Sequence, residues 1–347
     1  MTAFWFGALS LMLAIYVVLD GFDIGAAILH LFVARSDPER RSVLQAIGPY
    51  WDGNEVWLLA AGGVLVFAFP RAYAAAFAGF YLPLMLVLWI LIARGMAMEV
   101  RSRDTSPLWR SFWDAVLALA SVGLAILLGA AFANVIRGVG LAGRWFSTPL
   151  FTNFLVSRRP GVLDWYTVLV GIFTAIALAV HGGLFLACKT AEPVASRSRE
   201  AAVRLLPWQA LLAVLVTAAT IRVQPVLFGA MLRRPLAWPL EFIAIAAPAY
   251  AYAQARRRHD LWAFLASCAF LACMLAAGCA GLYPHLLISR VSPVWDINAG
   301  AAAAGSISLL SGLWWWPASF VLVTIYFANL FRQFRGRVAT SDDSGHY

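Results

Sequence analysis

The chain has 347 residues, of which 62% are hydrophobic and 12% are charged. Soluble globular proteins carry about 45–50% apolar and about 25% charged residues, so this composition leaves too few polar side chains to solvate a globule. The sequence therefore predicts an integral membrane protein. The formal net charge of +9 does not indicate a nucleic-acid-binding protein, because the basic residues lie in short clusters between long apolar runs.

Apolar runs close to the length of about 20 residues that a membrane-crossing helix needs recur along the whole chain. They predict nine transmembrane helices, at 3–33, 43–69, 73–98, 111–136, 164–188, 207–230, 238–255, 261–285 and 308–331. No soluble domain separates them. We therefore expect an all-α polytopic protein with a single transmembrane domain over 1–338 and a polar C-terminal tail over 339–347.

Loop charges predict the orientation of these helices. Most of the 26 lysine and arginine residues follow the first, third, fifth and seventh predicted spans or lie in the C-terminal segment. Cytoplasmic loops of membrane proteins carry such an excess of positive charge. The N-terminus is therefore expected outside and the C-terminus in the cytoplasm, which agrees with an odd number of spans.

Acidic side chains concentrate in the first predicted hairpin. Asp20 and Asp23 lie in the sequence DGFDIG, and Asp52, Asn54 and Glu55 lie in WDGNEVW. Ionisable groups inside the membrane are costly and mark functional sites by default. Four carboxyl groups at similar depth cannot all be ionised without partners, so they fit a proton relay. The alternative is a structural role, in which the acids cap a kinked helix or pair with arginines. For Asp20 and Asp23 the residues alone favour this structural role.

Four further side chains in the predicted spans have competing interpretations. Arg94 is interpreted as an anchor at the membrane interface, and the alternative is that it neutralises one of the buried carboxylates. Glu99, five residues later, is expected to be a supporting polar residue. Trp57 either packs in the bundle or lines a passage for a small apolar gas, and packing is favoured. His181 in AVHGGLF is expected to be a hydrogen-bonded bundle residue. No histidine pair suited to haem ligation and no metal motif is apparent.

At this point the sequence resembles a known family. The segments DGFDIG, IGPYWDGNEVWLL, YAAAFAGFYLPL, RGMAMEVRSR and FANVIRG occur in the order and spacing found in subunit II of the cytochrome bd-type quinol oxidases. The later segments LYPHLLIS and VWDINA are similar to it more loosely. Membership of the cyanide-insensitive branch is left open.

The resemblance implies an enzyme of at least two subunits in the bacterial inner membrane that oxidises quinol, reduces oxygen to water with cytoplasmic protons and generates a proton motive force. It implies that haems b and b/d reside on a separate subunit I, and that this chain binds no cofactor directly and folds as two four-helix bundles plus a peripheral helix. A small single-span accessory subunit, membrane lipids and a structural quinone accompany some members; nucleic acid is not an expected partner.

The resemblance also assigns roles to residues. Asp52 matches the aspartate of a cytoplasmic proton path, with Glu55, Asp20 and Asp23 beside it, and Trp57 matches a tryptophan near an oxygen entrance. The rival hypothesis is a secondary transporter with a carboxylate ion-coupling site. Such transporters place discontinuous helices in both halves of a repeat, whereas the acids here occupy one hairpin, so this alternative is weaker.

Overall fold

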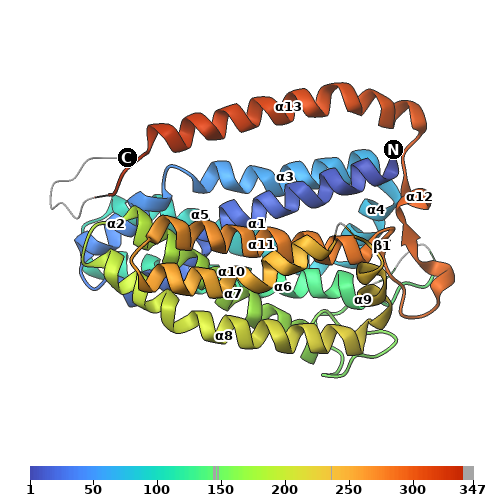
Figure 1. The fold of residues 1–347 in the computed structure, drawn as a ribbon, viewed down its shortest axis with the longest axis horizontal. Helices are drawn as coiled ribbons and strands as arrows, with labels where there is room; N and C mark the ends of the chain where they lie inside the picture. Colours follow the sequence, from blue (N-terminus) through green and yellow to red (C-terminus); the bar gives the residue numbers. More distant parts are fainter. Residues whose placement is uncertain (144–145, 147, 236, 339–347) are drawn as a thin grey trace.

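The computed structural model describes residues 1–143, 146, 148–235 and 237–338, so the expected tail at 339–347 lies outside the described residues. The long helices run side by side (Figure 1). In chain order the elements are α1 (Thr2–Val33), α2 (Asp37–Ile47), α3 (Trp51–Ala68), α4 (Pro70–Gly79), α5 (Tyr81–Val100), η1 (Arg101–Arg103), α6 (Pro107–Arg137), α7 (Trp165–Lys189), α8 (Val194–Val223), α9 (Pro225–Leu232), α10 (Ala237–Arg256), α11 (Asp260–Leu282), β1 (His285–Leu287), η2 (Pro293–Trp295), β2 (Ile297–Asn298), α12 (Ala299–Ala302) and α13 (Ser306–Gln333).

Seven of the described helices are long and apolar enough to cross a membrane by themselves, and the sharply bent pair α9 and α10 would make an eighth span. The seven are α1, α5 with η1, α6, α7, α8, α11 and α13. Helix α3, which carries two acidic residues in its first turns, runs beside α1 in Figure 1. The expected number of nine spans depends on counting α3 as well and stays a prediction.

Two predicted spans are wrong as continuous helices. The run 43–69 is divided at Gly48–Tyr50, where Pro49 has no N–H to continue the helical ladder, and its first residues belong to the short polar helix α2. The run 73–98 is divided at Phe80 into α4 and α5. Pro83 cannot donate to the carbonyl of Gly79, and that carbonyl accepts a hydrogen bond from the Thr148 N–H instead, at 3.1 Å.

The sixth predicted span, 207–230, is displaced. Helix α8 starts at Val194 because the arginines that suggested a loop are paired within the fold: Arg197 contacts Glu39 and Arg199 contacts Asp260, both at 2.6 Å. The helix then ends before Pro225, and the short helix α9 follows it. The other predicted spans agree with α1, α6, α7, α10, α11 and α13 within a few residues.

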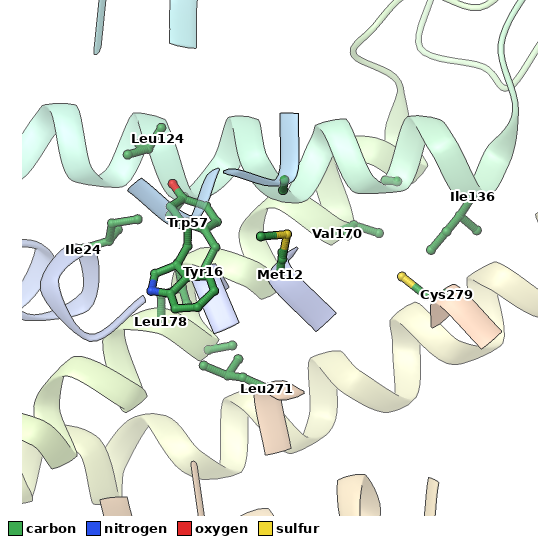
Figure 2. Close-up of a cluster of buried hydrophobic side chains, with 14 of the residues drawn as sticks. Met12, Tyr16, Ile24, Trp57, Leu124, Ile136, Val170, Leu178, Leu271 and Cys279 are labelled. Carbon is green, nitrogen blue, oxygen red and sulfur yellow. The ribbon is translucent and has the colours of Figure 1, made fainter. Parts of the chain in front are cut away.

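Helix α1 lies in the middle of the molecule and packs against α3, α6, α7 and α11. Its crossing with α7 is very close: a Cβ added at Gly25 would lie 1.8 Å from the Leu178 carbonyl oxygen. Only glycine allows two helix backbones to approach in this way. Figure 2 shows the apolar interior around this region, where Met12, Tyr16 and Trp57 face side chains of α6, α7 and α11.

Helix α13 lies along one side of the bundle, over α3 (Figure 1). It packs through aromatic side chains: Phe320 and Phe327 contact the ring of Trp57, and Trp316 contacts Trp5. The two short strands β1 and β2 pair antiparallel in the segment before α13. The position of α13 is compatible with the expected peripheral helix, while the division of the remaining helices into two bundles stays a prediction.

Candidate functional site

A buried ion-pair cluster joins α1, α3 and α5. The Arg94 guanidinium donates to Asp20 Oδ1 at 2.8 Å and to Glu55 Oε1 at 2.7 Å. Arg94 is 1% exposed and Asp20 is fully buried, whereas the Glu55 side chain is 25% exposed. The interpretation of Arg94 as an interface anchor is therefore wrong, because its charge is enclosed by the bundle. Its partners are the carboxylates that the first hairpin supplies.

Asp23 lies one turn from Asp20 and has a different environment. It is fully buried, and Asn54 Nδ2 donates to its Oδ2 at 2.6 Å and to the Leu19 carbonyl at 3.1 Å. Within the described residues, Asp23 Oδ1 and Asn54 Oδ1 have no hydrogen-bond partner. Asp20 therefore has a cation as its partner, while Asp23 has the neutral amide of Asn54.

Asp52 and Glu99 do not join this buried cluster. Both residues are exposed on the surface of the chain, Asp52 on the first turn of α3 and Glu99 near the end of α5. In the part of the chain that the structure describes, neither forms an ion pair, so the role of Glu99 as a supporting polar residue stays a prediction. Asp52 lies one turn from Glu55, which is half-buried and points toward Arg94.

Two buried aromatic side chains, Trp57 and Tyr16, lie on the helices α3 and α1 that supply the carboxylates of the cluster. Both side chains are buried and belong to the same hydrophobic cluster (Figure 2). Neither the Trp57 Nε1–H nor the Tyr16 hydroxyl has a partner among the described residues. Among the described charged groups, Asp20 and Arg94 act most strongly on the Tyr16 hydroxyl. Sequence reasoning missed Tyr16, although a tyrosine one helical turn before Asp20 in an otherwise apolar run was the available signal.

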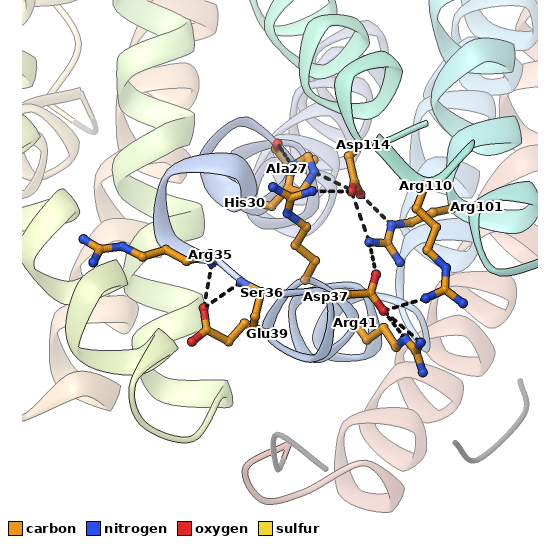
Figure 3. A network of polar contacts seen from close by, with 11 residues as sticks. Ala27, His30, Arg35, Ser36, Asp37, Glu39, Arg41, Arg101, Arg110 and Asp114 are labelled. Atoms are coloured by element: carbon orange, nitrogen blue, oxygen red, sulfur yellow. Dashed lines mark hydrogen bonds and ion pairs between the residues drawn. The ribbon is translucent and has the colours of Figure 1, made fainter. Parts of the chain in front are cut away.

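A second polar network, also missed from the sequence, lies at the α2 end of the bundle (Figure 3). Asp114, fully buried on α6, accepts from Arg101 Nε at 2.5 Å and from Arg40 Nη1 at 3.0 Å. Arg101 also donates to Asp37 at 2.9 Å. Partial burial opposes ionisation of Asp37, but the hydrogen bond and charge of Arg101 and the neighbouring arginines outweigh it and lower the pKa of this carboxyl.

A third group of polar residues fixes the opposite end of α6. Arg137, which directly follows the predicted span at 111–136, is fully buried and donates to Asp164 and to Asn134 Oδ1. Asp164 also caps α7 by accepting from the N–H groups of Tyr166 and Thr167 at 3.0 Å. This arrangement satisfies buried charges and a helix terminus, which indicates a structural role.

The histidines of the bundle are already engaged by protein groups. His181 Nδ1 lies 2.7 Å from Ser267 Oγ, and Nε2 lies 2.9 Å from the Val18 carbonyl. His30 Nδ1 contacts the Ala27 carbonyl at 2.7 Å, and its Nε2 faces Asp114. Across the described ranges, no group of three histidine, cysteine, aspartate or glutamate side chains is placed to hold a metal ion. These histidines do not fit a haem as a facing pair of ligands.

The fold and the acid–arginine cluster together define a polytopic helical membrane protein with a buried ionisable site between three adjacent helices. The family described as cytochrome bd terminal oxidase subunit II matches residues 1–334. The chain therefore belongs to this family, and the resemblance seen in the sequence is confirmed. It is an inner-membrane subunit of a cytochrome bd-type quinol oxidase of the respiratory chain, which implies a partner subunit I.

Individual relatives agree with this assignment. The chain is 28% identical over 306 residues to cytochrome bd ubiquinol oxidase subunit 2 of Bacillus subtilis, covering 88% of this chain and 87% of that protein. It is 28% identical over 365 residues to cytochrome bd-I ubiquinol oxidase subunit 2 of Escherichia coli, covering 97% and 95%. The fold is similar to a chain of the bd oxidase from Geobacillus thermodenitrificans, with a TM-score of 0.77, 16% identity and coverage of 96% and 98%. These findings do not favour the transporter hypothesis.

Proposed function

We propose that this chain is the haem-free subunit of its oxidase and that the buried cluster of α1, α3 and α5 carries cytoplasmic protons toward subunit I. Reduction of oxygen to water consumes protons, and taking them from the cytoplasm while quinol is oxidised outside would generate a proton motive force. The observation that carries the proposal is the charge balance of the cluster. The cluster contains one buried cation, Arg94, which pairs with Asp20 and Glu55, and a third carboxyl group, Asp23, which has no cationic partner among the described residues.

Charge balance supports Asp23 as the proton carrier. A buried charge is stable only when it is paired, and otherwise the group becomes neutral. Arg94 pairs with Asp20 and with Glu55, whereas Asp23 is hydrogen-bonded by the Asn54 amide. Because Asn54 donates to Oδ2, a proton on Asp23 occupies Oδ1, the oxygen without a partner in the described residues. That proton can be passed to a water molecule without breaking an ion pair.

The entrance of the path is the exposed side of α3 and α5. Asp52 and Glu99 are exposed on these two helices, and the same helices also expose the apolar residues Leu59 and Trp89. A carboxylate facing lipid is costly, so a protein surface is the better cover for this face, and subunit I is the occupant that we assign to it. Asp52 would then collect protons at the subunit boundary, and the half-buried Glu55 would pass them inward.

The proposal also includes the orientation in the membrane, the absence of haem and the role of Trp57, and a separate observation bears on each. The excess of cations at the α2 end of the bundle supports a cytoplasmic location for this end and an outside N-terminus. The hydrogen bonds of His181 support the absence of haem from this chain. The aromatic contacts of Trp57 with α13 support packing rather than an oxygen passage. A quinone or an accessory subunit has no specific support from the described residues.

The experiment that tests the proposal replaces Asp52 in the assembled oxidase. Asp52→Asn removes the titrating group but keeps the shape of the side chain, and we expect a lower rate of quinol-dependent oxygen consumption with unchanged haem content and subunit ratio. Asp104→Asn, which alters an exposed acid in the loop after α5, is the matched control and should leave the rate unchanged. A fully active Asp52→Asn oxidase would refute the proton-entry role.

A further inference from the structure

The turn between α10 and α11 carries three consecutive arginines without acidic partners. Arg256, Arg257 and Arg258 are exposed, and within the described chain none of them forms an ion pair. Asp260, the acid closest to them in the sequence, is already engaged, because Arg199 donates to both of its carboxylate oxygens, at 2.6 and 2.8 Å. The turn therefore carries three cations whose N–H donors are available to a ligand.

Other nearby charges do not neutralise the turn. Arg337 also donates to Asp260, at 3.3 Å, and so adds a cation beside it. Glu192, in the loop before α8, is exposed and forms no ion pair in the described part of the chain. The pKa of its carboxyl is lowered by hydrogen bonding with Ser196 and, more weakly, by the charges of nearby arginines that include Arg258. One such carboxylate cannot balance three arginines, so a surplus of positive charge remains.

The backbone conformation at Arg258 favours glycine. Its φ is +60°, in the left-handed region that L side chains rarely adopt. The His259 N–H donates to the Gln254 carbonyl at 2.9 Å. The Arg258 N–H donates to the Ala255 carbonyl at 3.1 Å, and the two bonds together form the Schellman arrangement that usually ends a helix with glycine. The local fold therefore does not account for an arginine at this position, whereas a ligand for its exposed guanidinium would.

An apolar stripe on the outer side of α10 leads away from Arg256. Residues that recur at intervals of three or four positions lie on one side of a helix. Counted back from Arg256 at these intervals, the exposed residues are Tyr252, Ala249, Ile245, Phe242 and Trp238. We name these five residues the α10 stripe. Phe242 is 73% exposed and Ile245 is 76% exposed, so Arg256 lies in line with an uncovered apolar surface.

The α10 stripe has the length and position of a lipid-facing surface. The opposite side of the helix is buried and consists of small residues, namely Ala244, Ala247, Ala251 and Ala255. From Trp238 to Arg256 the helix rises by about 27 Å, which is close to the thickness of about 30 Å of the hydrocarbon core. Tyr252, one turn before Arg256, and Trp262 on the first turn of α11 are exposed aromatic side chains of the kind found at head-group level. The stripe therefore crosses the acyl region, and the arginines lie among the head groups.

The arginine turn lies at the α2 end of the bundle and away from the face assigned to subunit I. Arg199 on α8 pairs with Asp260, and Arg197 on the same helix pairs with Glu39 of α2. Helix α10 packs mainly against α11 and to a smaller extent against α8 and α9. In Figure 1, α3 lies above α1 and α10 lies below it. The α10 stripe is thus a different surface from that of α3 and α5, which leaves membrane lipid as its neighbour.

We propose that the arginine turn at 256–258 binds the phosphate of an anionic phospholipid, one acyl chain of which lies along the α10 stripe. Guanidinium groups pair with phosphate oxygens through parallel N–H donors. The surplus charge of the turn requires an anion, and the stripe in line with Arg256 requires an apolar chain, so a single molecule that has both is the occupant. This inference does not depend on the proton-path proposal.

Native mass spectrometry of the purified oxidase complex tests this site. The complex is delipidated in a neutral detergent and titrated with phosphatidylglycerol or with phosphatidylcholine of the same acyl chains, and the bound lipids are counted. Arg256→Gln/Arg257→Gln/Arg258→Gln should bind one phosphatidylglycerol fewer per complex than the unmodified protein, with phosphatidylcholine binding unchanged. Arg204→Gln is the matched control, because this exposed arginine of α8 pairs with Glu200 and should leave both counts unchanged.

Arg258→Gly provides a second variant that keeps the fold. Glycine suits a φ of +60°, so the turn should form at least as readily as in the unmodified chain while one guanidinium is lost. Because an arginine near the membrane surface strengthens binding to anionic lipid about fivefold, the half-saturating concentration of phosphatidylglycerol should rise about fivefold.

Four results would overturn the proposal. They are an unchanged phosphatidylglycerol count in the triple variant, an equal loss of phosphatidylcholine, full competition by inorganic phosphate, and loss of a protein component in place of lipid. If the triple variant does not assemble, an unchanged half-saturating concentration in Arg258→Gly contradicts the site by itself.

Discussion

Replacing Arg94 by glutamine tests the charge balance of the acid cluster. The substitution removes the only cation that contacts Asp20 in the described chain and leaves that fully buried carboxylate without its partner. Glu55 also loses its pair, but it is 25% exposed and can be solvated. Breaking a buried ion pair by removing one partner costs about 3–5 kcal/mol. We therefore expect Arg94→Gln to lower the free energy of unfolding by about this amount or to reduce assembly of the complex.

A double-mutant cycle isolates the contribution of the ion pair. In Arg94→Gln/Asp20→Asn neither charge of the buried pair remains. The double variant should therefore recover part of the free energy of unfolding that Arg94→Gln loses, with a coupling energy of about 1–3 kcal/mol between the two positions. The free energy of unfolding of the Arg94→Lys complex should lie between that of the unmodified complex and that of Arg94→Gln, because an ammonium group keeps the charge but cannot pair with Asp20 and Glu55 through a planar fork.

The assay is denaturant-induced unfolding of the purified complex in detergent, with haem absorbance reporting on the partner subunit. Arg204→Gln, at an exposed pair on α8, should change the unfolding free energy by less than about 0.5 kcal/mol. An Arg94→Gln complex as stable as the unmodified one, or stability losses that add without coupling, would refute the charge-balance reasoning.

Three further predictions concern other parts of the chain. Tyr16→Phe should slow oxygen consumption about fivefold at constant haem content, because the buried Tyr16 hydroxyl has no partner among the described residues and is free to bind a water molecule of the proposed proton path, a hydrogen bond that contributes about 1 kcal/mol; an unchanged rate would exclude this role. Gly25→Ala should abolish assembly or cost more than about 3 kcal/mol, since the added Cβ meets the α7 backbone, whereas Gly62→Ala, with open space around it, should be tolerated; purification yields distinguish the two. Finally, because the pKa of Asp37 is lowered in the folded state, its stabilising effect should be present above about pH 4 and fade as the pH falls further. The difference in unfolding midpoint between the unmodified complex and Asp37→Asn should therefore shrink on acidification, and a difference that grows would contradict the pairing.

The sequence was sufficient to predict the membrane class, most helix positions and the acids of the first hairpin, because these depend on hydropathy and local spacing. The acids at positions 20, 23 and 55 indeed meet in one buried cluster. The partners of the acids were harder to predict. Arg94 lies in a different predicted span, and whether an arginine near a span end faces lipid head groups or a buried carboxylate depends on tertiary packing.

Helix interruptions and long-range pairs were predicted least well. The division at Phe80 depends on the Thr148 N–H, which is far away in the chain and satisfies the Gly79 carbonyl that Pro83 leaves free. Asp114 was not singled out because its partners, Arg40 and Arg101, come from two other segments. The same arginines were counted only as loop charges that set orientation. Such pairings are not visible in apolar periodicity.

The central claim, that protons cross this chain through the buried cluster, is tested most directly by proton uptake in vesicles that contain the purified oxidase with its cytoplasmic side facing a pH-sensitive dye. The measurement compares Asp23→Asn with the unmodified complex during oxygen reduction driven by added quinol. The account predicts that Asp23→Asn slows proton uptake at least tenfold while haem content is unchanged and the cluster remains assembled. Proton uptake at the unmodified rate in Asp23→Asn would contradict the account.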